Sequence, residues 1–204
     1  MNKDPLMMMA MFGRAHNITQ WCERFPKWDF SRRDRAVGAT ALAHAIWIGP
    51  NKLEAVKALV KAGANPLEFT ALTGTTCLHN AAANKDADVE LFRYLLNIPG
   101  MRALVNTPMH GRTWKWRVAY LAARLLVKLG AKKAILLELS EWPKNTALVG
   151  ATRNGNTAVM KVLVEEGGAD TQLRNSRGHT ALDGLVGGAN ALEATRMLLG
   201  GGVM

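Results

Sequence analysis

Apolar residues recur along this chain at helical spacing, in short segments separated by turns. In residues 53–60 and 89–96, apolar side chains return every three or four positions, which predicts amphipathic helices with one buried face. The segments that precede them are rich in alanine: residues 41–45 and 81–83 contain three alanines each. Such small side chains would let neighbouring helices approach closely. The pattern therefore predicts an all-α protein built from pairs of helices.

These pairs repeat along the chain. A Thr-x-Leu opening, or a degraded form of it, recurs at steps of 33 to 37 residues: Thr40, Thr76, Thr113, Thr146 and Thr180. A threonine or aspartate there can accept a hydrogen bond from an unpaired backbone N–H at the start of a helix. A period of this length predicts stacked repeats, because one unit cannot bury its apolar face alone. We therefore expect residues 1–204 to form a single domain of six units that begin near residues 4, 40, 76, 113, 146 and 180.

Each unit also ends on a glycine, which tolerates the positive φ that closes a helix. The closing positions are Gly63, Gly100, Gly130, Gly168 and Gly201. The last of these lies among three consecutive glycines, which predicts a poor C-terminal cap. That ending leaves open that the chain is part of a longer protein.

The openings and closings together resemble the ankyrin-repeat family. The best matches are Gly-Thr-Thr-Cys-Leu-His-Asn-Ala-Ala at residues 74–82, Gly-His-Thr-Ala-Leu at 178–182, and Gly-Ala-Asp at 168–170 after an apolar helical run. The resemblance implies a curved helix-turn-helix solenoid with short β-turn fingers. It implies a non-catalytic module that binds another protein on its concave side. It also implies that His79 hydrogen-bonds the backbone of a neighbouring finger.

One unit departs from the pattern. Thr113 to Gly130 spans 17 residues, against 21 to 24 elsewhere, so this unit is about one helical turn short. We expect an irregular linker or an extra short helix in residues 132–145, which contain Trp142-Pro143. We also expect weak coupling between the repeats on either side.

Fingers and inner helices supply the candidate partner-binding residues, following the family resemblance. Trp47 is the strongest candidate, because exposure of an indole ring to water is unfavourable unless a partner covers it. The alternative is that Trp47 is buried under the loop at residues 49–51. The full set is Trp47, His44, Ile48, Phe69, Asn80, Met109, His110, Arg112, Arg153, Arg174 and Arg177.

Signals of catalysis are missing from the sequence. No two of its five histidines, and no histidine and cysteine, have the spacing of zinc ligands, and no phosphate-binding glycine motif is present. Cys22 and Cys77 fall on helix faces that we expect to be buried, so core thiols are the preferred interpretation. We therefore expect no enzymatic activity, metal, cofactor or small-molecule substrate. The alternative is that the chain is an accessory domain of a larger enzyme.

Charge changes the picture in one segment. The chain has 26 Lys+Arg against 16 Asp+Glu, a net charge of +10, and residues 99–137 hold eight Lys and Arg without one acid. We expect a helix that begins after Lys115. On this helix, three basic residues share one edge: Arg117, Arg124 and Lys128. The apolar residues Val118, Ala122, Leu125 and Leu129 form an adjacent face that we expect to be buried.

Two interpretations of this basic patch stay open. The patch consists of Arg117, Arg124, Lys128 and Lys132. It is either solvated charge or a site for an anionic partner. An acidic protein is favoured over nucleic acid or an anionic membrane surface, and charge there would mainly steer association.

The cellular compartment of the protein is predicted from two features that the sequence lacks. No apolar run approaches the 18 to 20 residues, roughly, that a membrane span needs. Two cysteines cannot build a disulfide framework. We expect an intracellular protein, cytoplasmic or nuclear.

Overall fold

The computed structural model describes residues 4–49, 52–84 and 87–184, and over these ranges the protein is helical without a β-strand. The all-α prediction is therefore confirmed for the described residues. The helices are α1 (Pro5–Met11), α2 (Ala15–Arg24), α3 (Ala41–Trp47), α4 (Lys52–Lys61), α5 (Cys77–Ala82), α6 (Val89–Leu96), α7 (Trp114–Lys128), α8 (Ala134–Glu141), α9 (Ala147–Arg153) and α10 (Thr157–Lys161). Two short 3-10 helices, η1 (Met101–Leu104) and η3 (Leu182–Gly184), and a π-helical turn, η2 (Val162–Glu166), complete them.

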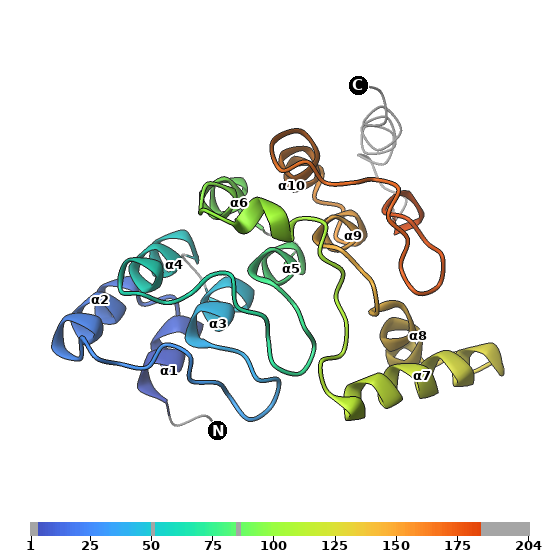
Figure 1. Ribbon diagram of the computed structural model, residues 1–204, viewed down its shortest axis with the longest axis horizontal. Helices are drawn as coiled ribbons and strands as arrows, with labels where there is room; N and C mark the ends of the chain where they lie inside the picture. The colour runs from blue at the N-terminus through green and yellow to red at the C-terminus, as the bar shows by residue number, and fades with distance from the viewer. Residues whose placement is uncertain (1–3, 50–51, 85–86, 185–204) are drawn as a thin grey trace.

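Most helices lie in two rows (Figure 1). In the inner row, α1 contacts α3, α3 contacts α5, and α5 contacts α9. In the outer row, α2 contacts α4, α4 contacts α6, and α6 contacts α10 and η2. One contiguous apolar core joins the rows, from Leu6 in α1 to Ala181. No helix in the described ranges is long and apolar enough to cross a bilayer.

The predicted threonine caps form at most openings. The hydroxyls of Thr40, Thr76 and Thr113 accept from the backbone N–H three residues on, at 3.3, 3.3 and 3.4 Å. Asp4 caps α1 in the same way. Thr146 is an exception: it occupies the cap position of α9, but its side chain makes no capping hydrogen bond.

The predicted closing glycines within the described residues all adopt positive φ: Gly63, Gly100, Gly130 and Gly168. An L-residue with a side chain rarely adopts this conformation, so glycine is the natural choice there. The remaining closing position, Gly201, and the predicted frayed end lie outside the described residues.

The loops that precede α3, α5 and α7 lie side by side. The backbone N–H of Ala71 donates to the carbonyl oxygen of Gly38 at 3.0 Å. In the next loop, the N–H of Arg112 donates to the carbonyl oxygen of Leu72 at 3.1 Å. Backbone hydrogen bonds therefore connect consecutive loops along the inner row.

The segment that follows Thr113 does not continue either row. Helix α5 packs directly on α9: a Cβ placed on Gly150 would lie 3.3 Å from Cβ of Ala82, and Nδ2 of Asn154 donates to the Ala82 carbonyl oxygen at 2.8 Å. Helix α7 instead packs mainly on α8, beside the rows (Figure 1). We call residues 113–141 the α7–α8 hairpin. We expected weak coupling because the irregular segment would interrupt the stacking of the repeats on either side of it. That expected interruption is wrong, because α5 and α9 are in direct contact.

Helix α7 also differs from its prediction in its bounds. It begins at Trp114, not after Lys115, because Thr113 caps it, and it runs for 15 residues. Gly130 therefore closes the first helix of this pair. The second helix, α8, is the extra short helix that we expected between residues 132 and 145.

The face of α7 that we expected to be buried is in solvent. Val118 and Leu125 are exposed, whereas the buried residues of this helix are Tyr120 and Ala123 on the opposite side. The prediction was wrong because α7 is apolar on two sides. A periodic pattern identifies such sides but does not say which one meets a neighbour.

Candidate functional site

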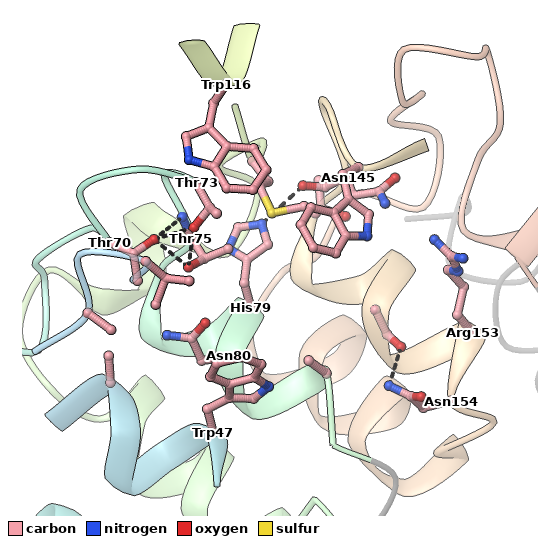
Figure 2. A pocket seen from close by; sticks show the side chains of 18 residues that line it. Trp47, Thr70, Thr73, Thr75, His79, Asn80, Trp116, Asn145, Arg153 and Asn154 are labelled. Carbon is pink, nitrogen blue, oxygen red and sulfur yellow. Dashed lines mark hydrogen bonds between the residues drawn. The ribbon is translucent and has the colours of Figure 1, made fainter. Parts of the chain in front are cut away.

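A cavity of about 410 Å³ opens between the loops and the inner row of helices (Figure 2). Its walls come from the inner helices α3, α5 and α9, the loops before α3 and α5, and the chain at both ends of the α7–α8 hairpin. Its size lies in the range of pockets that hold small molecules or side chains of a bound peptide. The cavity therefore lies where consecutive units and the hairpin meet.

Three tryptophans line this cavity: Trp47 at the end of α3, Trp116 in α7, and Trp142 after α8. Trp47 is 45% exposed, and its carbonyl oxygen accepts from Nδ2 of Asn84 at 3.4 Å. Figure 2 shows Trp47 and Trp116 on opposite sides of the cavity, with His79 between them. Aromatic rings on opposite sides of a cavity offer apolar walls for a side chain that enters between them.

The loop before α5 contributes three hydroxyl groups. The hydroxyl oxygen of Thr70 lies 2.5 Å from that of Thr73 and 2.7 Å from that of Thr75, and it also accepts from the Thr75 N–H at 3.0 Å. These bonds hold the loop in one conformation (Figure 2). A hydroxyl donates once and accepts twice, so the cluster keeps capacity for a polar group of a ligand.

His79 forms the rigid centre of the site. Its Nδ1 accepts from the backbone N–H of Thr76 at 3.2 Å, and its Nε2 lies 3.0 Å from the carbonyl oxygen of Asn145. Because an N–H only donates and a carbonyl only accepts, the proton is on Nε2. Burial lowers the pKa of His79 to about 4, although the bond to Asn145 opposes this. His79 is therefore neutral at pH 7, and its predicted structural role is confirmed.

The charge of the lining is small. Arg153 is the single cation among the residues that line the cavity in the described part of the chain, and no carboxylate accompanies it. The remaining polar groups are the threonine hydroxyls and the amides of Asn80, Asn145 and Asn154. This composition favours a ligand with an apolar side chain and neutral or acidic polar groups around it.

The structure brings four of the predicted binding residues to this cavity: Trp47, Asn80, Met109 and Arg153. Ile48 is exposed at the end of α3 but does not line it. His44 is buried, with Nε2 3.1 Å from Oδ2 of Asp34, and is therefore not available to a partner.

The other predicted residues lie in the loops and do not line the cavity. The guanidinium of Arg112 lies 4.9 Å from the centre of the Phe69 ring, and His110 is exposed beside Pro108. Arg174 and Arg177 are exposed in the loop that precedes η3.

The basic patch forms a separate surface. Arg117, Arg124 and Lys128 follow one edge of α7, and Lys132 lies in the turn after it. The Arg117 side chain is not only solvated, since its Nε donates to the carbonyl oxygen of Gly111 at 3.0 Å.

Several lining residues were not predicted. The repeat pattern does not point to Trp116, the three loop threonines or Asn145, and it places Trp142 only in a segment expected to be irregular. Trp142 lies next to a proline in a segment that we expected to be a linker. No local signal places it at the same cavity as Trp47, because its position depends on the hairpin folding back toward the inner row.

The two thiols lack the features of a nucleophile. Burial, with a smaller contribution from Glu68, raises the pKa of Cys77 to about 12. Burial, followed by the charge of Glu23, also raises the pKa of Cys22, which is only half-buried. Within the described ranges, no group of three or more His, Cys, Asp and Glu side chains is placed to hold a metal ion.

Comparison with known proteins leaves the family open. No protein-family model matches the chain, and a search of the curated proteins finds no match either. The resemblance to ankyrin repeats therefore stays a prediction that rests on the residues themselves.

Proposed function

We propose that this protein is a non-catalytic interaction module, an ankyrin-type solenoid that binds a partner polypeptide on its concave side. The cavity beside Trp47 is the anchor point. Two rows of helices, capped threonine openings and hydrogen-bonded consecutive loops support the solenoid. The free cysteines Cys22 and Cys77 fit an intracellular setting.

The observation that carries this function is the exposure of Trp47. A tryptophan that is 45% exposed at the rim of an aromatic cavity has the character of an interface anchor. Interface hot spots are enriched in Trp, Tyr and Arg, and they lie in pockets that a partner covers. Trp47 and Arg153 supply two of these residue types at one cavity.

The composition of the cavity defines the class of partner. An apolar or aromatic side chain would fill the space between Trp47 and Trp116. Backbone groups of an extended segment would meet the hydroxyls of the threonine loop and the amide of Asn80. Such a ligand gains affinity from apolar burial and a few placed hydrogen bonds.

The test is selection of binding peptides from a displayed random library on the folded protein. The selected peptides are then measured against two tryptophan variants. Trp47→Ala should weaken binding at least about 30-fold, the loss that corresponds to a hot spot of about 2 kcal/mol. Trp114→Ala is the matched control, because Trp114 is exposed and lies outside the cavity.

Equal binding of the selected peptides to wild type and to Trp47→Ala would overturn this function. So would a selection that enriches no peptide. A loss in Trp114→Ala without a loss in Trp47→Ala would move the binding surface to the hairpin.

A further inference from the structure

The side of α7 that faces away from α8 carries a stripe of exposed apolar side chains. Trp114, Val118, Leu121, Leu125 and Leu129 are 70, 54, 65, 57 and 75% exposed. They recur every three or four residues, so they share one side of the helix along about 22 Å of its axis. We call these five residues the α7 stripe.

The stripe is not the packing face of α7. Tyr120 and Ala123 are buried on the opposite side, beside the half-buried Trp116. These buried residues are also not part of the contiguous core that joins the two helix rows. Helix α7 therefore has two apolar sides, one of which packs against its neighbours, mainly α8, while the other faces solvent. A contiguous exposed apolar surface of this kind marks an interaction site.

Three cations lie along one long edge of the stripe, and one lies at the start of the other edge. At 100° per residue, Arg117, Arg124 and Lys128 lie along one edge and Lys115 along the other. Lys132 and Lys133 are exposed just beyond the end of the helix. Residues 99–137 contain no acid in sequence. The occupant of the stripe must therefore combine an apolar interior with negative charge at its surface.

A second copy of this chain does not meet that requirement. Two α7 stripes facing each other would bring the same cations together, since both edges carry one sign of charge. Like charges across a helix interface oppose association.

We propose that α7 binds the surface of an anionic lipid bilayer. The stripe would enter the boundary between head groups and acyl chains, and the lysines and arginines on its edges would contact the acidic head groups. An amphipathic helix with Trp and Leu on one face and basic residues beside it binds lipid surfaces in this orientation. The indole of Trp114 suits the interface, where its ring is apolar and its N–H stays hydrated.

The shape of the stripe favours a bilayer over an acidic protein. A single helix presents a convex ridge, so a protein would need a groove matched to it along about 22 Å. Lipids instead rearrange around the ridge. The three cations on one edge and Lys115 on the other would also contact head groups on both sides of the ridge, which an acidic helix lying along one edge would not provide.

The first experiment measures binding of the full chain to vesicles of phosphatidylcholine, with and without about one third phosphatidylserine. Binding should be strong to the anionic vesicles at low salt, weak to the neutral ones, and reduced as salt rises. Trp114 should report the depth of insertion. Brominated lipids should quench its fluorescence, and this quenching should disappear in Trp114→Phe.

The variants separate the stripe from the charged edge. Leu121→Asp with Leu125→Asp should reduce vesicle affinity at least tenfold. Arg124→Gln with Lys128→Gln should reduce it about 25-fold, at about fivefold per cation removed. Phe12→Asp is the matched control, because Phe12 is a similarly exposed apolar residue at the C-cap of α1. It should leave vesicle binding unchanged. If circular dichroism shows a loss of helix in the double leucine variant, Leu129→Asp replaces it, since Leu129 lies at the C-cap.

Four outcomes would overturn this inference. The first is absence of binding to anionic vesicles at low salt, and the second is equal binding to neutral vesicles. The third is tighter binding to an acidic helical peptide than to vesicles, which would assign the stripe to a protein. The fourth is a concentration-dependent dimer, seen by light scattering, that Leu121→Asp with Leu125→Asp abolishes, which would assign it to a second copy.

Discussion

Helices α5 and α7 begin alike and end in different surroundings. Thr76 and Thr113 each accept from the backbone N–H three residues on, at 3.3 and 3.4 Å. Helix α5 then runs for six residues between α3 and α9, and Leu78 is fully buried. Helix α7 runs for 15 residues, mainly against α8, and Leu125 is 57% exposed.

The difference shows that a local start signal and an apolar pattern do not decide which helix joins the rows. Gly150 lets α9 approach α5 closely, so the inner row continues without α7. The α7–α8 hairpin then has one packed side and one free side. Four predictions test this contrast.

The largest effect should come from an aspartate placed on the buried side of α5. The same substitution on the exposed side of α7 is the comparison. Leu78→Asp buries a carboxylate without a partner and should lower the free energy of unfolding by more than about 4 kcal/mol. Leu125→Asp should change it by about 0.5 kcal/mol or less, because the side chain is in solvent. Urea unfolding followed by circular dichroism measures both. Similar losses would mean that the stripe is covered in solution.

Acid should destabilise the protein through His79, which belongs to α5. Burial lowers the pKa of His79 from 6.5 to about 4. Between these values the unfolded chain binds a proton that the folded protein does not, so the free energy of unfolding falls as pH decreases. The loss is complete near pH 4 and amounts to about 3 kcal/mol at most. Above pH 6.5 the contribution is fully present.

The variant His79→Gln should lack this part of the pH dependence. Exposed His110 offers the control, and His110→Gln should keep the wild-type profile. The measurement is the free energy of unfolding between pH 7 and pH 4 for all three proteins. Identical profiles for wild type and His79→Gln would contradict the prediction.

A larger residue at the contact of α5 and α9 should have an intermediate effect. Gly150→Leu would push against Ala82 and should lower the free energy of unfolding by about 1 to 3 kcal/mol. Ala122→Leu makes the same kind of enlargement on the exposed side of α7 and should be nearly neutral. Thermal unfolding compares the two. A neutral Gly150→Leu would show that α5 and α9 are not in contact.

The smallest effect concerns the two threonine caps. Thr76→Ala and Thr113→Ala each remove a cap worth about 1 kcal/mol. The loss at Thr76 should appear in global unfolding, because α5 belongs to the core. At Thr113 it should appear mainly as about fivefold faster hydrogen exchange in α7, because Tyr120 and Ala123 lie outside the contiguous core and we expect the hairpin to open independently. A Thr113→Ala variant whose global stability falls as much as that of Thr76→Ala would instead make the hairpin part of the cooperative core.

The candidate site was predictable only in part. The inner-helix positions Trp47, Asn80 and Arg153 follow from the repeat, since each unit places them on the same side. Trp142 and Asn145 do not, because they reach the cavity through the fold of the hairpin. His44 was expected at the surface but is buried. Its partner is Asp34, a residue of the loop that precedes α3.

The sequence by itself determined the helical class, the start of α5 at Thr76 and the positive φ of the closing glycines, because caps and turns depend on a few neighbouring residues. Only the tertiary structure decided that α5 meets α9, that the α7–α8 hairpin lies beside the rows, and that Val118 and Leu125 face solvent. These outcomes depend on contacts between residues far apart in the chain. Where a helix has two apolar sides, only packing selects the one that is buried.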